Sequence, residues 1–299
     1  MRRATADRAF YRNRLYCRPS FGISLHFLMM GAGHYENFPV GSVLLPAHLR
    51  RPVAAVYRFA RQADDFADEG ERSPEERLAL LEGYREELRA LEAGKPSHTA
   101  FFAELGAVIG EYRLPYRPFH DLLDAFSQDA VKKRYENFAE LLEYCRRSAN
   151  PVGRLVLRLY RSDQDPRYLD WSDAICSALQ LANFWQDIEI DFRKGRIYLP
   201  QEDMARYGIG EAQIAARDSG GEWPELMRFE IARSRELMQS GAPLATRLPG
   251  RIGLELRTIV QGGLRIFEKL ERVNGDVFRN RPVLRAWDWP LVLGRALAM

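Results

Sequence analysis

The chain has 299 residues, of which 46% are hydrophobic, so it can bury a sizeable core and is expected to be globular. Its 44 basic and 41 acidic residues leave a formal net charge of only +3, a balance too even for a general nucleic-acid-binding protein. The amino terminus lacks the apolar core of a signal peptide, and no run of about 18 apolar residues suits a membrane span. Three widely spaced cysteines, Cys17, Cys145 and Cys176, fit neither a disulfide framework nor a zinc site, which favours a reducing, cytoplasmic location.

Helical periodicity dominates the chain. Residues 75–94 repeat apolar side chains every three or four positions, start after the cap signal Ser73-Pro74 and stop at Gly94. The same pattern predicts helices over residues 50–68, 118–131, 138–148, 171–190, 223–240 and 251–273. Alternating strand patterns are nearly absent, and the connectors are short, without a shift in composition. The sequence therefore predicts an all-α bundle forming one domain over residues 1–299.

Residues 58–70, RFARQADDFADEG, crowd acidic side chains at the end of one predicted helix. Helical spacing places the acidic side chains in two neighbouring stripes. The first stripe contains Asp64 and Asp68 together with Tyr57 and Arg61, and the second contains Asp65 and Glu69. One interpretation is a solvated helix end capped by Gly70. However, the helix dipole disfavours acids at a carboxyl-terminal end, so a divalent cation is the simpler compensation.

A second polar stripe lies in residues 179–200, LQLANFWQDIEIDFRKGRIYLP. Gln180, Asn183, Asp187 and Asp191 follow one another at spacings of three and four, which predicts one face of one helix whose other faces are apolar. A buried polar seam neutralised by arginines from neighbouring helices would give the same pattern. An oxygen-lined cation site is the other interpretation.

Together, the two acidic helices predict a magnesium site that holds a diphosphate. Oxygen ligands without His or Cys suit a hard cation, and Mg²⁺ takes only one or two carboxylates per ion, leaving room for water and substrate phosphate. The sequence has no glycine-rich phosphate loop of the G-x-x-x-x-G-K-[ST] type. Phosphate would therefore be bound through metal and arginine.

These two segments resemble the aspartate-rich motifs of the squalene and phytoene synthase family. Residues 144–153, YCRRSANPVG, resemble the middle segment of that family, and residues 276–282, DVFRNRP, resemble its closing region. The resemblance implies a single-domain isoprenoid-synthase helical bundle with a central apolar cavity for prenyl chains. It also implies Mg²⁺ held between the two aspartate-rich helices.

The resemblance assigns roles to individual positions. The metal ligands would be Asp64, Asp68, Asn183, Asp187 and Asp191, with Asp65 and Glu69 as their neighbours. The catalytic positions would be Tyr57 and Arg61, which approach the substrate diphosphate, and Tyr198, which lies beside the reacting carbons. The substrate-binding positions would be Asn37, Phe38, Tyr144, Val152 and Gln180.

Two departures from the family pattern bear on the reaction. Many relatives carry Ser-x-Ser-Phe before the first acidic helix and an arginine before the central aspartate of the second motif, where this chain has ENFPVGS (36–42) and Gln186. These changes remove donors that would meet a second diphosphate. The chain is most similar to the hydroxysqualene synthase branch, which implies that it converts presqualene diphosphate and water to hydroxysqualene and diphosphate in the squalene and hopanoid route. That function would couple it to a presqualene diphosphate synthase and require no NADPH, in agreement with the absence of a dinucleotide fingerprint.

Three alternatives remain open at this stage. The chain could join prenyl diphosphates head to head, giving presqualene diphosphate, squalene, dehydrosqualene or phytoene. It could be a non-catalytic scaffold relative, although such a protein would be expected to lose the metal ligands. A magnesium-dependent nucleotide pyrophosphohydrolase would also use acidic helices, but the apolar segment at residues 21–30 favours a lipid substrate.

The carboxyl-terminal residues 285–299, RAWDWPLVLGRALAM, are apolar and aromatic. Trp287 and Trp289 suit a lipid interface, which predicts a protein peripheral on the inner face of the cytoplasmic membrane. The alternative is a terminal helix docked on the bundle.

Overall fold

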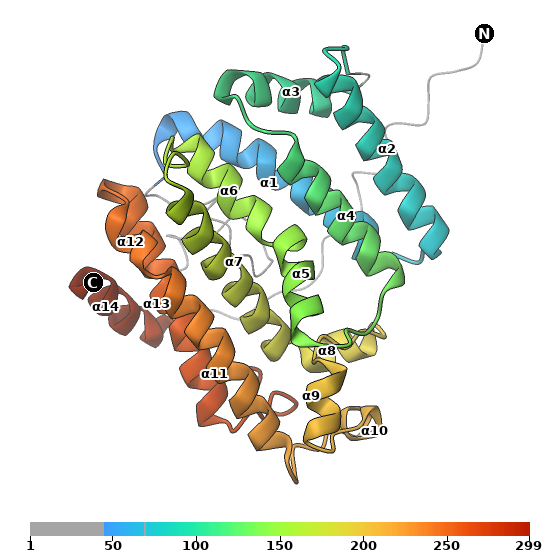
Figure 1. The fold of residues 1–299 in the computed structure, drawn as a ribbon, viewed down its shortest axis with the longest axis vertical. Helices are drawn as coiled ribbons and strands as arrows, with labels where there is room; N and C mark the ends of the chain where they lie inside the picture. The colour runs from blue at the N-terminus through green and yellow to red at the C-terminus, as the bar shows by residue number, and fades with distance from the viewer. Residues whose placement is uncertain (1–44, 69, 98) are drawn as a thin grey trace.

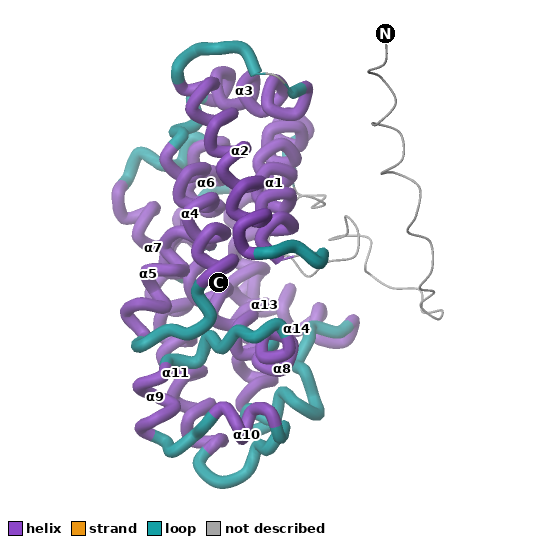
Figure 2. The backbone as a smooth tube through the Cα atoms, turned by 90° about the vertical axis from the view of Figure 1, so that its right-hand side faces the viewer, coloured by secondary structure: helices purple, strands orange, loops and turns teal. Residues whose placement is uncertain are grey.

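The structure is a computed structural model, and it describes residues 45–68, 70–97 and 99–299. Regular structure within these ranges is helical, without a strand, which confirms the all-α prediction (Figures 1 and 2). The helices are α1 (Ala47–Asp68), α2 (Pro74–Glu92), α3 (Ala100–Tyr112), α4 (Arg117–Val131), α5 (Phe138–Ser148), α6 (Asn150–Leu159), α7 (Pro166–Gln186), α8 (Ile188–Arg193), α9 (Gln201–Arg206), α10 (Glu211–Ala215), α11 (Trp223–Gly241), α12 (Pro243–Arg247), α13 (Gly250–Arg272), the 3₁₀ helix η2 (Ala286–Asp288) and α14 (Trp289–Ala298).

Two hydrophobic clusters hold these helices together. The amino-terminal cluster is built from α1 to α4 and α6, and Phe59 and Phe119 lie at its centre with their rings edge to face, 5.2 Å apart. The carboxyl-terminal cluster is built mainly from α5, α7, α11 and α13 around Trp185, Trp223 and Phe267, all fully buried. Helix α7 runs through the middle of the bundle, between α6 and α11 (Figure 1). A site on the last turns of α7 is therefore held by the core of the molecule.

Helix starts follow the local signals in the sequence. At the start of α2, the Ser73 hydroxyl accepts the Glu76 N–H at 3.3 Å, and the Glu76 carboxylate accepts the Ser73 N–H at 2.8 Å, a complete capping box. Thr99 and Asn137 cap α3 and α5 in the same way, through one side-chain bond each.

The acidic end of α1 is stabilised by an arginine from the next helix. Arg77 on α2 donates to the carbonyl oxygens of Phe66 at 3.2 Å and Gly70 at 2.8 Å. Gly70 has a φ of +77°, which a glycine adopts without strain. The carbonyl groups that end α1 thus meet a positive charge, and this offsets the unfavourable position of the acids at that end.

The spacing of the second acidic segment predicted one helix, and this prediction was wrong. The regular helix α7 ends at Gln186, Asp187 has φ −107° and ψ 13°, and α8 begins at Ile188. Hydrogen bonds continue across the break, from the Asp187 N–H to Asn183 at 2.9 Å and from the Asp191 N–H to Asp187 at 2.8 Å. The break therefore changes the local direction of the chain without interrupting the stripe of polar side chains.

Helix α14 packs on α13 and buries Val292 and Ala296. The outward side chains of this segment remain in solvent: Trp287 is 66% exposed and Leu297 is 70% exposed. Among the described residues, no helix is long and apolar enough to cross a membrane.

Candidate active site

The predicted polar stripes meet at one pocket of about 160 Å³. It lies where the end of α1 faces the last turns of α7 and the start of α8. Its lining residues are Asp64, Asp68, Asp129, Tyr144, Gln180, Asn183, Phe184, Asp187, Asp191, Arg196 and Tyr198. All five predicted metal ligands are among them, although they come from segments more than a hundred residues apart.

We call the first side of the pocket the acidic wall; it consists of Asp64, Asp68, Asn183, Asp187 and Asp191. Burial raises the pKa of Asp64 to about 7. The negative charges of Asp68, Asp129 and Asp65 act in the same direction, and the positive charge of Arg61 acts against them. Burial and the neighbouring Asp187 raise the pKa of Asp191 to about 8. Both carboxyl groups thus hold their protons well above the ordinary pKa of an aspartate, chiefly because burial disfavours the charged form and neighbouring carboxylates repel it.

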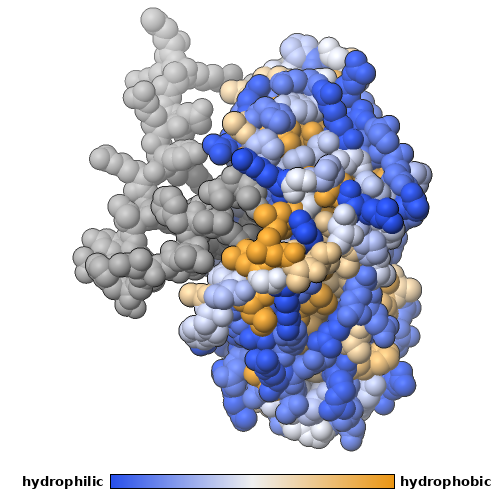
Figure 3. All heavy atoms as spheres, turned by 90° about the vertical axis from the view of Figure 1, so that its left-hand side faces the viewer, coloured by the Kyte–Doolittle hydropathy of each residue, from blue (hydrophilic) through white to orange (hydrophobic). Residues whose placement is uncertain are grey.

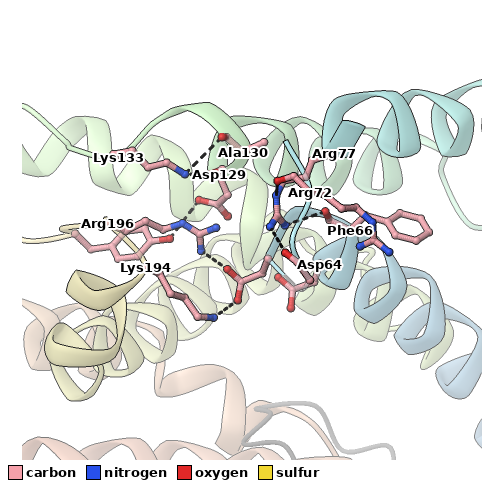
Figure 4. Close-up of polar contacts among 12 residues, drawn as sticks. Asp64, Phe66, Arg72, Arg77, Asp129, Ala130, Lys133, Lys194 and Arg196 are labelled. Atoms are coloured by element: carbon pink, nitrogen blue, oxygen red, sulfur yellow. Dashed lines mark hydrogen bonds and ion pairs between the residues drawn. The ribbon is translucent and has the colours of Figure 1, made fainter. Parts of the chain in front are cut away.

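Besides Arg61, which pairs with Asp64 at 3.5 Å, three cations that were not assigned from the sequence reach the acidic wall. Asp68 forms ion pairs with Lys194 and with Arg196, the latter at 2.7 Å (Figure 4). Burial acts to raise the pKa of Asp68, but the hydrogen bond from Lys194 and the charge of Arg196 outweigh it and hold this pKa below its ordinary value. On the other side, Arg281 pairs with Asp187 at 2.5 Å. These three cations therefore form ion pairs with Asp68 and Asp187, while Asp64 is paired with Arg61.

The donor set of the acidic wall fits magnesium. Every predicted ligand offers oxygen, and the raised pKa values of Asp64 and Asp191 mark a place where added positive charge would be stabilised. Among the described residues, no three His, Cys, Asp or Glu side chains converge on one ion.

The opposite side of the pocket, which we call the tyrosine wall, consists of Asp129, Tyr144, Phe184 and Tyr198. Asp129 on α4 is 6% exposed, and it accepts hydrogen bonds from the Tyr144 hydroxyl at 2.5 Å and the Tyr198 hydroxyl at 3.2 Å. Burial raises the pKa of Asp129 to about 6, against the charge of Arg196 and the two hydroxyl donors. Figure 4 shows Arg196 between Asp129 and the acidic wall.

Aromatic rings make up most of the tyrosine wall. Phe184 stacks on Tyr198 with ring centroids 3.9 Å apart and planes 7° from parallel. The Tyr144 ring lies 5.9 Å from Tyr198 and 6.0 Å from Phe184, and Tyr135 packs behind them. Ring faces beside a wall that would hold diphosphate through metal ions suit a substrate that separates into a diphosphate and a carbocation, because rings attract cations and exclude water.

The other predicted residues lie outside this pocket or outside the described ranges. Arg61 pairs with Asp65 at 2.7 Å and Asp64 at 3.5 Å, so it borders the acidic wall from α1. Tyr57 is half-buried two turns earlier, and Val152 packs against the amino-terminal cluster. Neither Tyr57 nor Val152 lines the pocket. Asn37, Phe38 and Glu69 fall outside the described residues.

Sequence reasoning missed four charged residues of the site: Asp129, Lys194, Arg196 and Arg281. Three of them lie in the segments FRKGRIYLP and DVFRNRP, but no sequence pattern connects their charges with the acidic helices. Asp129 had no distinguishing signal, since it lies in an ordinary amphipathic helix. Its place opposite Tyr144 and Tyr198 depends on the packing of α4 against α5.

Comparisons with known proteins agree with this geometry. The squalene/phytoene synthase family profile matches residues 32–288. A hydroxysqualene synthase from Zymomonas mobilis is 33% identical over 237 residues, 78% of each chain. A phytoene synthase from Arthrospira platensis is 29% identical over 268 residues, 86% of each chain.

A solved structure is similar in both sequence and fold. The squalene synthase HpnC from Alicyclobacillus acidocaldarius is 38% identical and superimposes with a TM-score of 0.74, covering 81% of this chain and 90% of that one. The profile match, the relatives and the paired aspartate-rich helices lead to one conclusion: this chain belongs to the squalene/phytoene synthase family.

Proposed function

We propose that this protein is a magnesium-dependent hydroxysqualene synthase, which converts presqualene diphosphate and water to hydroxysqualene and diphosphate. The observation that carries the proposal is one pocket lined both by carboxylate and amide oxygens and by stacked aromatic rings. Hydroxysqualene synthases at 32–33% identity motivate this branch of the family, and a phytoene synthase at 34% identity makes a head-to-head synthase the alternative to compare.

The residues divide the reaction between the two walls. Asp64, Asp68, Asn183, Asp187 and Asp191 would hold the metal ions, and bound Mg²⁺ would supply positive charge where the departing diphosphate gains negative charge. Lys194, Arg196 and Arg281 lie within reach of the same wall and would bind diphosphate oxygens directly once the carboxylates turn to the metal. The Phe184 and Tyr198 rings would face the carbocation and keep bulk water away from it.

The surroundings of Gln186 support a single-diphosphate substrate. Its side chain is 2% exposed, and it donates to the carbonyl oxygen of Pro282 at 2.5 Å. Gln186 thus fixes the segment that carries Arg281, instead of presenting a cation for a second diphosphate. A reaction that begins from one diphosphate and ends in capture by water needs neither a second diphosphate site nor a hydride donor.

The test compares two substrates under one set of conditions. Purified protein is incubated with Mg²⁺ and either presqualene diphosphate or farnesyl diphosphate, without NADPH, and both released diphosphate and organic products are measured. We expect an alcohol from presqualene diphosphate and little turnover of farnesyl diphosphate. Presqualene diphosphate or a hydrocarbon formed from farnesyl diphosphate would instead place the protein among the head-to-head synthases. Absence of diphosphate release from either substrate would favour a scaffold role.

We also propose that the protein works at a membrane surface on the cytoplasmic side. The support is a set of exposed apolar side chains on η2 and α14, namely Trp287, Leu291, Leu293, Leu297 and Met299. Apolar side chains gather at mid-height on the face that Figure 3 shows, the side of the molecule on which α14 lies in Figure 1. Arg285 lies over the Trp287 ring at 5.1 Å, so a cation accompanies the aromatic group, as at many lipid interfaces.

Flotation with vesicles tests this location. Vesicles of phosphatidylcholine with an anionic lipid should carry the protein upward, and Trp287→Ser combined with Leu297→Ser should weaken this association. Leu80→Ser, at another exposed leucine on α2, is the matched control. Equal flotation of all three proteins would contradict a role of α14 in membrane contact.

A further inference from the structure

Asp129 is the one acidic residue of the pocket that lies on the tyrosine wall. It faces the pocket from α4, more than thirty residues before the second aspartate-rich segment. Both of its carboxylate oxygens are used, Oδ2 by the Tyr144 hydroxyl and Oδ1 by the Tyr198 hydroxyl. All three residues are at most 7% exposed. The arrangement is a buried carboxylate with two phenols aimed at it.

The charge of Asp129 determines where the phenol protons point. An ionised carboxylate only accepts hydrogen bonds, and each hydroxyl has a single proton to donate. With both protons directed at Asp129, the lone pairs of Tyr144 and Tyr198 are left for the pocket that both residues line. The charge of Arg196 favours the ionised form of Asp129. Because the pKa of Asp129 is about 6, this carboxylate is largely ionised above neutral pH. The tyrosine wall therefore presents two oriented acceptors next to its stacked rings.

We infer that Asp129 is a positioning residue that fixes the hydroxyls of Tyr144 and Tyr198 as acceptors for the water molecule that captures the carbocation. This inference rests on the proposed hydroxysqualene synthase function, because it concerns how that reaction ends in an alcohol. A water molecule that donates to the two phenol oxygens keeps its own lone pair free. The lone pair can then point toward the carbocation held against Phe184 and Tyr198.

The step balances without a further reagent. When the carbon–oxygen bond of presqualene diphosphate breaks, its electron pair leaves with the diphosphate. After the carbon skeleton rearranges, the lone pair of the positioned water forms the new carbon–oxygen bond. The diphosphate still bound at the acidic wall takes the proton that the captured water loses. No electron is exchanged with a cofactor, and the tyrosines and Asp129 end in the state in which they began.

Asp129→Asn tests the inference with little change in shape. An amide offers one acceptor and one donor group, so it can no longer receive both hydroxyl protons, and one phenol must turn its proton toward the pocket. Water would then lose one of its two acceptors. We expect diphosphate release from presqualene diphosphate to fall by less than the yield of alcohol. The fraction of product present as hydroxysqualene should drop by about three- to tenfold, the worth of one hydrogen bond, while products of proton loss rise.

Two phenol variants and one control keep the test independent of folding. Tyr198→Phe and Tyr144→Phe each remove one acceptor and should shift the product ratio in the same direction. Asp121→Asn changes another buried acid of α4, 8% exposed and paired with Arg117, which does not line the pocket. It should leave the product ratio unchanged.

The outcomes separate the inference from the function on which it rests. If the wild-type protein makes hydroxysqualene and Asp129→Asn lowers total turnover with an unchanged product ratio, Asp129 is only structural and the inference is overturned. The same holds if Tyr144→Phe and Tyr198→Phe keep the wild-type ratio. If the wild-type protein releases diphosphate from presqualene diphosphate but forms no alcohol, the proposed function itself fails.

Discussion

Carboxyl groups with raised pKa values lie on both walls of the pocket, but their hydrogen-bond partners differ. On the tyrosine wall, Asp129 receives two hydroxyl groups, so the polar atoms are satisfied within the protein. On the acidic wall, Asp64 and Asp191 keep pKa values of about 7 and 8 because burial and like charges outweigh the nearby cations. The difference supports the proposal that the acidic wall would hold metal ions, while the tyrosine wall would shape the reacting group.

Removing one carboxylate from the acidic wall should have the largest effect. We expect Asp64→Asn and Asp187→Asn to lower turnover by about 100- to 1,000-fold, the usual cost of losing one group that stabilises developing charge. Asp64→Asn should leave thermal stability equal or higher, because it relieves repulsion. Turnover is measured with Mg²⁺, and thermal melting is measured without it. The control is Asp124→Asn on α4, whose carboxylate pairs with Arg85 away from the pocket. Near-normal turnover in both acidic-wall variants would show that the wall does not hold the metals.

A bulkier residue where α7 meets α11 should disturb both walls together, because α7 and the residue after it carry Asn183, Phe184 and Asp187. A Cβ atom added at Gly241 would lie 2.5 Å from the Trp171 carbonyl oxygen and 2.7 Å from Ile175 Cγ1. We expect Gly241→Ala to reduce the free energy of unfolding by about 1–3 kcal/mol. Gly83→Ala, where nothing lies within 4 Å, should instead leave stability equal or raised by up to about 1 kcal/mol. Equal urea midpoints for the two variants would contradict this close packing.

A variant of Arg281 tests the acidic wall separately from the tyrosine wall, because Arg281 pairs with Asp187 of the acidic wall. Arg281→Met removes the ion pair with Asp187 and one donor for diphosphate. We expect about a tenfold loss in kcat/KM, which corresponds to one charge-assisted hydrogen bond. Inhibition by free diphosphate should also become weaker. Arg279→Met, at an exposed arginine paired only at 3.6 Å with Asp276, is the control from the same segment. The product ratio should stay unchanged in both variants. A shift toward hydrocarbon in Arg281→Met would contradict the assignment of Arg281 to the acidic wall.

A further expected effect is on the pH dependence of stability without metal. A folded-state pKa of about 8 for Asp191, above its ordinary 3.8, means that the folded protein binds a proton that the unfolded chain has released. The free energy of unfolding should therefore decrease as pH rises from about 4 to 8. Asp191→Asn should make this decrease shallower, as shown by urea titrations in EDTA. Identical slopes in wild type and variant would mean that Asp191 is not destabilised when ionised.

The sequence was most informative where a pattern is local. Helical periodicity, the Ser73 cap and the spacing of Asp64 with Asp68 all depend on neighbours along the chain, and the structure contains each of them. The assignment of one unbroken helix through Asp187 was wrong, because the chain changes direction at a residue whose hydrogen bonds remain helical.

The contacts between distant segments were beyond the reach of the sequence patterns. Asp129 meets Tyr198 across 69 positions, and Arg281 meets Asp187 across 94. Such pairs depend on how the helices and their connecting segments pack together, which periodicity does not encode. The extent of the domain over residues 1–299 and the roles of individual site residues remain predictions, to be tested by the variants above.

The most direct test of the account follows the oxygen atom of the product. The protein is incubated with presqualene diphosphate and Mg²⁺ in water enriched in oxygen-18, and the alcohol is analysed by mass spectrometry. Because the carbon–oxygen bond of the substrate breaks and water captures the cation, we predict hydroxysqualene that carries oxygen-18 from the solvent. An alcohol that retains the substrate oxygen, or a product without oxygen, would contradict capture of a carbocation by water in this pocket.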